Sequence, residues 1–128
     1  MDDAASSPRL EPPPVHGAEA AAVADRPFPG VWRETHQTER ATVTAYAFEP
    51  GAGFPSHSHS EEQITVVLAG EAEFTVAGTA RQLGPGETFV LAAGVEHGLT
   101  AGPAGARFLA VIVPRRERPD AYEIRSDE

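Results

Sequence analysis

Two histidines separated by a single residue mark the part of this sequence that is best equipped for chemistry. His57 and His59 are followed four residues later by Gln63, and His97 lies in a second segment that contains glycine. In an extended chain, residues of equal parity point to the same face, so His57, His59 and Gln63 can face one cavity. Imidazole suits zinc, copper, iron and nickel, and an amide oxygen can fill a further position. The pattern predicts a divalent metal site formed by His57, His59, Gln63 and His97.

Turn and strand signals surround both histidine segments. Glycines and Pro55 precede the first pair, the β-branched run 64–67 follows it, and Gly70 comes next. This order is typical of a loop, a strand, a tight turn and a second strand. The second segment repeats the order, with an expected strand over residues 88–91 before Gly94 and His97. Both segments therefore place their histidines next to strands.

Further short strands are expected along the rest of the chain. Residues that favour strands alternate with glycine and proline turns, and no helical period persists. The expected strands are 41–48, 71–76, 81–83, 88–91 and 107–113, with turns at 69–70, 84–86 and 102–105. Short strands with turns at this spacing predict an all-β sandwich or barrel.

The first histidine segment resembles the first motif of the cupin family. That motif is a glycine, five residues, His-x-His, three or four residues, a glutamate, six residues and a glycine. The chain has this spacing throughout at Gly51, His57, His59, Gln63 and Gly70, with glutamine in place of the glutamate. The substitution is the one departure from the motif.

The second segment resembles the second cupin motif less completely. That motif is a glycine, five residues, a proline, one residue, a glycine, two residues, a histidine, three residues and an asparagine. Gly86, Gly94 and His97 match, whereas Ala92 and Ala101 replace the proline and the asparagine. The resemblance implies a cupin-type double-stranded β-helix, also called a jelly-roll barrel, over residues 28–114. A cupin fold hosts unrelated activities, so the function must be argued from the site.

The two ends of the chain differ in composition from this barrel. Residues 1–27 are rich in proline and alanine and are expected to be disordered. Residues 115–128 form a charged tail in which 121–125 can add one edge strand. A barrel of this size with apolar strand faces gains burial by association, so we expect a homodimer.

Composition narrows the class of protein and its partners. The chain has 128 residues, room for one domain, and its net charge of −9 with a pI of about 4.9 argues against nucleic acid. It has no cysteine, which excludes disulfides and thiolate ligands. No apolar run approaches the roughly twenty residues of a membrane helix, and no secretory signal is recognisable. We expect a cytoplasmic protein with a small-molecule substrate and no membrane partner.

The glutamine makes the expected ligand set neutral, so a bound ion keeps its full charge. Such a site favours Lewis-acid chemistry with zinc, nickel, manganese or ferrous iron, among which the sequence does not choose. Small cupins with this glutamine resemble enzymes that act on keto sugars in uronate breakdown, and others resemble metal-dependent cyclases of natural-product pathways. The resemblance implies an isomerase or cyclase of a small keto or hydroxy compound. A metal-dependent dioxygenase and a non-enzymatic binding or sensor module stay open as alternatives.

Charged side chains near the histidines are candidates for further roles. Glu61 shares the parity of the ligands, so we expect it to face the cavity as a catalytic proton carrier. Arg81 and Arg107 are candidates for binding a substrate carboxylate, because arginine can bind one through two parallel hydrogen bonds.

Overall fold

The computed structural model describes residues 10–17, 22–116 and 123–124. Every helix or strand assigned in these ranges is a strand, and none of the described residues forms a helix able to cross a membrane. The strands are β1 (Val23–Phe28), β2 (Val31–Gln37), β3 (Thr42–Phe48), β4 (Gly53–Ser58), β5 (Glu62–Val76), β6 (Thr79–Leu83), β7 (Thr88–Leu91), β8 (His97–Val113) and β9 (Glu123–Ile124).

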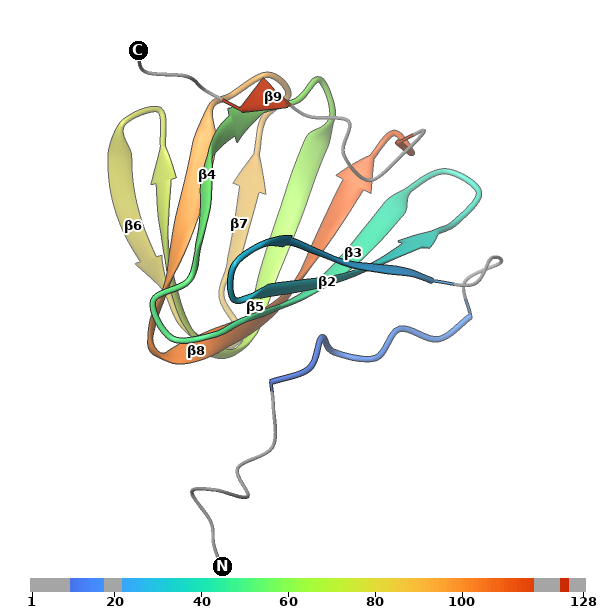
Figure 1. Ribbon diagram of the computed structural model, residues 1–128. Helices are drawn as coiled ribbons and strands as arrows, with labels where there is room; N and C mark the ends of the chain where they lie inside the picture. The colour runs from blue at the N-terminus through green and yellow to red at the C-terminus, as the bar shows by residue number, and fades with distance from the viewer. Residues whose placement is uncertain (1–9, 18–21, 117–122, 125–128) are drawn as a thin grey trace, which may run out of the picture.

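Two long strands, β5 and β8, bend and take part in both layers of the barrel (Figure 1). One layer runs β1-β2-β3, continues through the second half of β8 and the first half of β5, and ends at β7. The other layer joins β9 and β4 to the first half of β8, followed by the second half of β5 and β6. All pairings are antiparallel, and this arrangement confirms the predicted all-β jelly-roll barrel.

The bends of β5 and β8 replace two turns that the sequence predicts. Residues 69–70 are expected to form a hairpin turn and 102–105 a loop, but both lie inside continuous strands. Gly70 and Gly105 have positive φ, and the pairing register shifts on both sides of Gly70. A Cβ atom at Gly70 would collide with the backbone of Gly105, so glycine is needed where the two strands cross from layer to layer.

The barrel interior is apolar at its centre and polar toward one end. Phe48, Phe74 and Phe108 are at most 1% exposed, and Tyr46 stacks on Phe108 with ring centroids 4.8 Å apart. Burial of each such side chain contributes about 1.5–3 kcal/mol to stability. Farther along the same inner face, β5 carries Gln63, which pairs with Leu91 of β7 and with Ile112 of β8.

The N-terminal part of the chain departs from the expected disordered tail. Strand β1 begins at Val23 and pairs with β2, so residues 23–27 belong to the sheet. Asp25 lies opposite Arg33, and the two form a two-point ion pair with distances of 2.9 and 2.6 Å, which gives β1 a polar anchor. The described residues 10–17 run outside the barrel, where Arg107 donates a hydrogen bond to the Glu11 carbonyl oxygen (Figure 1).

The C-terminal tail is described in part. Strand β9 falls inside the expected edge strand 121–125 and pairs with β4 at His57 and Ser58. Residues 121, 122 and 125 lie outside the described residues, as do 117–120 and 126–128. The pairing places the tail beside the strand that carries the first histidine (Figure 1).

Candidate metal centre

Three histidines meet at the polar end of the barrel. His57 on β4 is paired with His97 at the start of β8, and their ring centroids lie 4.3 Å apart. His59 follows the end of β4, with its ring centroid 4.9 Å from that of His97. One nitrogen from each ring can be chosen so that all three lie within 4.8 Å of one another, a group that can hold a metal ion. All three side chains are buried.

Backbone carbonyl groups fix the tautomer of each ring. The Nδ1 atoms of His57, His59 and His97 lie 2.7, 3.1 and 3.0 Å from the carbonyl oxygens of Pro55, Glu61 and Val95. A carbonyl oxygen can only accept, so each Nδ1 is assigned the proton and donates it. Each Nε2 then carries a lone pair, which is the form in which neutral imidazole binds metals.

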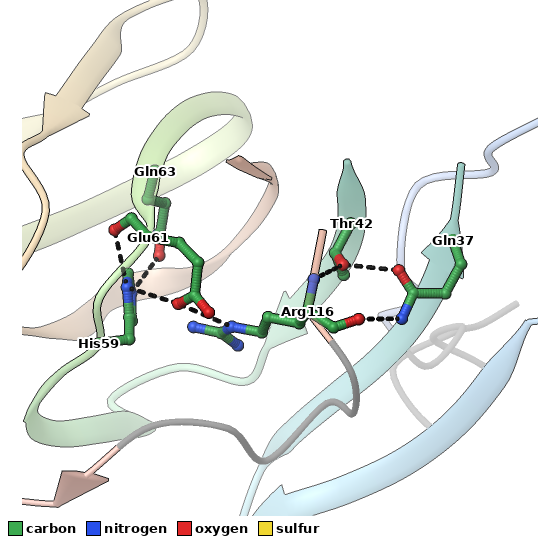
Figure 2. A network of polar contacts seen from close by, with 6 residues as sticks. All are labelled: Gln37, Thr42, His59, Glu61, Gln63 and Arg116. Carbon is green, nitrogen blue, oxygen red and sulfur yellow. Dashed lines mark hydrogen bonds and ion pairs between the residues drawn. The ribbon is translucent and has the colours of Figure 1, made fainter. Parts of the chain in front are cut away.

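Gln63 adds an oxygen to this group of nitrogens. Its Nε2 donates to Thr65 Oγ1 at 2.9 Å, which turns its Oε1 toward His59 Nε2 at 3.0 Å (Figure 2). With the tautomer assigned above, these two atoms are both acceptors, and two facing lone pairs need a cation between them or near them.

His97 supplies the second sign of a missing partner. Its Nε2 is buried, and among the residues that the structure describes no group forms a hydrogen bond to it. A buried polar atom without a partner is destabilising by about 1–3 kcal/mol. Among the described residues, Arg33 Nη1, Thr35 Oγ1 and His36 Nε2 share this state, but of these atoms His97 Nε2 is the one that lies beside other metal-binding nitrogens. The donor set of three imidazoles and one amide oxygen therefore fits a divalent transition metal.

The electrostatic surroundings keep the three imidazoles neutral. Burial, with a smaller contribution from His97, lowers the pKa of His57 from 6.5 to about 3. Burial also lowers the pKa of His97 to about 4. The pKa of His59 is lowered by burial and next by the charge of Arg116. Protons therefore compete weakly with a metal for these nitrogens at neutral pH.

Glu61 does not face the cavity as the sequence predicts. Its carboxylate lies 3.5 Å from His59 Nδ1, on the side of the ring away from Nε2, and 3.5 Å from Arg116 Nε (Figure 2). Parity predicts orientation only in an extended chain, whereas residues 59–61 lie outside the strands and the chain bends at 60–61, between β4 and β5. This position suits a group that orients His59 better than one that transfers a proton inside the cavity.

The cavity beside the histidines is small and has one arginine in its wall. Its volume is about 20 Å³, and it is lined by Tyr46, Phe54, His57, Gln63, His97, Leu99, Phe108, Ile112 and Arg116. A space of this size holds about one water molecule. Arg81 and Arg107, the arginines suggested by the sequence, are not among the lining residues: Arg81 lies over the Phe89 ring and Arg107 binds Glu11. Arg116 was missed because nothing in a charged tail distinguishes it from its neighbours.

Comparison with protein families gives one match over the barrel. A family model described as the cupin domain matches residues 45–112, more than half of the chain. The matched range contains all four proposed ligands. No curated protein matches the sequence.

Solved structures with the same fold include small cupins and larger enzymes. KdgF from Halomonas sp. is 25% identical, covers 78% of this chain and 97% of its own, and has a TM-score of 0.69. An RmlC-like cupin from Shewanella frigidimarina NCIMB 400 is 25% identical over 75% of this chain and 86% of its own, with a TM-score of 0.68. The oxalate decarboxylase OxdC of Bacillus subtilis is 18% identical over 91% of this chain but 34% of its own, with a TM-score of 0.76, and shows the fold alone.

Proposed function

The chain belongs to the family of cupin domains, and on this premise we propose that it is a metal-dependent enzyme of the isomerase or cyclase type. The ligands are His57, His59, Gln63 and His97, and the substrate is a small keto or hydroxy compound. The observation that carries the proposal is the convergence of neutral acceptor atoms, with His97 Nε2 buried and unpartnered within the described part of the chain. A divalent ion bound there supplies Lewis acidity, which polarises a carbonyl group or acidifies a hydroxyl group.

The residues around the ligands hold them in place and limit the access of water. The backbone carbonyl groups at Pro55, Glu61 and Val95 orient the three rings, and Thr65 orients the Gln63 amide. Phe54 and Phe108 give the cavity apolar walls, so electrostatic interactions inside it are weakly screened. This is the environment in which a neutral ligand set keeps an ion strongly electrophilic.

The charge of the ligand set can be tested by changing Gln63 to glutamate. The variant places a negative charge against His59 Nε2, so it should bind divalent metal at least as tightly as the unchanged protein. Its Lewis acidity should fall, and we expect turnover to decrease about tenfold or more, which corresponds to about 1.4 kcal/mol. Metal titration and anaerobic turnover are measured together. A variant with weaker metal binding or undiminished turnover would contradict the role of the neutral amide.

The reaction type is tested with and without dioxygen. The metal-loaded protein is incubated anaerobically with a panel of keto and hydroxy acids and sugars, and isomerisation or ring closure is followed by NMR. A chelator should abolish turnover, and oxygen should not be required. Oxygen consumption in every turnover would replace the proposal with the dioxygenase alternative. Ligand binding without turnover under either condition would favour a binding or sensor module.

We also propose that the chain forms a homodimer through the outer face of the first layer. Val43, Val111, Ile64 and Val90 lie in one row across β3, β8, β5 and β7. Ile64 and Val90 are 37% and 63% exposed, so the row presents apolar surface to solvent. Sedimentation should show a dimer at micromolar concentration, and Val90→Lys should shift it to a monomer.

Val23→Lys is the matched control for this prediction. Val23 is 56% exposed but lies on β1, outside the row. It should leave the dimer intact. A monomer in the unchanged protein, or equal effects of the two lysine variants, would refute this interface.

A further inference from the structure

Arg116 brings a positive charge into the wall of the metal cavity. It lies three residues beyond the end of β8, is 4% exposed, and lines the cavity with His57, Gln63 and His97. The other lining residues all lie in strands, whereas Arg116 lies between β8 and β9, outside any strand. The metal cavity therefore has one wall residue whose side chain is charged and whose backbone is outside the β-sheet.

Hydrogen bonds to its backbone direct this residue inward. The Arg116 amide donates to Thr42 Oγ1 at 2.8 Å, and its carbonyl oxygen accepts from Gln37 Nε2 at 2.9 Å. Thr42 Oγ1 in turn donates to Gln37 Oε1 at 2.6 Å. Figure 2 shows the Arg116 side chain running from this pair toward Glu61 and His59. The preceding Arg115 is exposed and donates instead to the Thr38 carbonyl oxygen.

Among the described residues that line the cavity or pair with its lining, positive charge exceeds negative charge when a divalent metal is bound. The four ligands are neutral, a divalent ion adds two positive charges, and Arg116 adds a third. Glu61 contributes one negative charge, with its carboxylate 3.5 Å from Arg116 Nε. Like charges in a poorly solvated site repel strongly. A further anion in the cavity would offset this excess.

Resting on the proposed function, we infer that the substrate carries a carboxylate and that the Arg116 guanidinium binds it in the metal cavity. A planar guanidinium matches a carboxylate with two parallel hydrogen bonds, which fixes both position and orientation. Glu61 already shows that this side chain pairs with a carboxylate here. The observed distance of 3.5 Å is long compared with about 2.7–2.9 Å for a strong pair, so a substrate carboxylate can compete for the guanidinium.

The cavity is too small to admit a substrate unless the Arg116 side chain moves. A space of about 20 Å³ holds about one water molecule, which is less than a small hydroxy acid needs. Since Arg116 is the lining residue outside the strands, its side chain can turn toward an entering carboxylate without breaking the barrel. The site should therefore prefer small oxo or hydroxy acids over their neutral counterparts.

The experiment measures binding of glycolate and of its neutral counterpart glycolamide to cobalt(II)-loaded protein, by visible absorption and calorimetry. The unchanged protein should bind glycolate at least about tenfold more tightly. Arg116→Gln should weaken glycolate binding by about 10- to 100-fold, the usual effect of a charge-assisted hydrogen bond, and leave glycolamide within about twofold. Because it removes a nearby positive charge, the same variant should retain cobalt at least as tightly. Arg115→Gln removes an equal charge outside the cavity and should change neither affinity.

Each possible result either supports or overturns carboxylate binding by Arg116. Equal affinity for glycolate and glycolamide, no glycolate binding with cobalt bound, or equal glycolate affinities in Arg116→Gln and the unchanged protein would overturn it and leave the proposed function standing. Failure of the unchanged protein to bind cobalt would overturn both. If Arg116→Gln does not fold, Arg116→Lys decides, because it keeps the charge and loses the planar fork. That variant should bind glycolate several-fold more weakly, and an unchanged affinity would overturn the inference.

Discussion

Replacing His97 with alanine is expected to abolish stoichiometric metal binding. The Nε2 atom of His97 is buried without a partner among the described residues and lies with the nitrogens of His57 and His59. Loss of groups that merely orient a ligand weakens metal affinity by about 10- to 100-fold, so loss of a ligand should exceed that. The measurement is metal content after dialysis together with a competitive titration. His59→Ala should have the same result for the same reason.

Two histidines outside the cavity provide the controls. His16 is an exposed residue of the described N-terminal segment, and His36 lies on β2 near Glu34. Alanine at either position should leave metal content unchanged. Full metal occupancy in a protein with both His57 and His97 replaced would show that the site has been assigned to the wrong residues.

The metal-free protein is expected to lose several kcal/mol of stability between pH 6.5 and 4.5. Burial holds the pKa of His57 at about 3 and that of His97 at about 4 in the folded chain, against 6.5 for an ordinary histidine. Above pH 6.5 these rings are neutral in both states and contribute no pH dependence. Below it, the unfolded chain binds protons that the folded chain does not, so stability falls by up to about 1.4 kcal/mol per pH unit for each ring.

Urea unfolding at several pH values measures this slope. Carboxylates also titrate in acid, so the informative quantity is the difference between the unchanged protein and a variant with asparagine at positions 57 and 97. The variant should lose most of the slope above pH 4.5. Added zinc should raise the stability by a nearly constant amount above about pH 5 and leave the slope unchanged, because metal binds the neutral rings of the folded state. If the unfolding free energy had the same slope against pH in the two proteins, the prediction that these buried imidazoles stay neutral would be wrong.

The parts of the fold that follow from local patterns could be read from the sequence. Alternation and turn residues locate the strands near 41–48, 81–83, 88–91 and 107–113, and the observed strands β3, β6, β7 and β8 include or closely match them. The bends were harder, because glycine at position 70 has the same local signature whether the chain reverses or crosses between layers. Strand β1 was missed because its residues are mostly exposed and polar or small, so the segment lacks the apolar alternation that marks a strand, although β1 forms a local hairpin with β2.

The candidate site, like the fold, could be predicted from the sequence only in part. The three histidines and Gln63 could be grouped because their spacing matches the two cupin motifs, and the structure brings their side chains together. Strand parity does not account for Gln63, because the chain bends between it and the first two histidines. Parity failed for Glu61 because the chain bends there. The sequence could not single out Arg116, because Arg115 and Arg116 have the same side chain. Only the tertiary contacts separate them: the backbone of Arg116 is held by Thr42 and Gln37 and its side chain is buried, whereas the exposed Arg115 side chain donates to Thr38.

The register that sets His57 opposite His97 links metal capture to the order of folding. These residues are about 40 positions apart, and they meet only when β4 has docked on β8. Closing so long a segment is entropically unfavourable, so this pairing belongs to the non-local contacts that form slowly in β proteins. An ion that needs all the ligands at once would therefore bind the finished barrel and slow its opening, because the unfolded chain offers only isolated histidines.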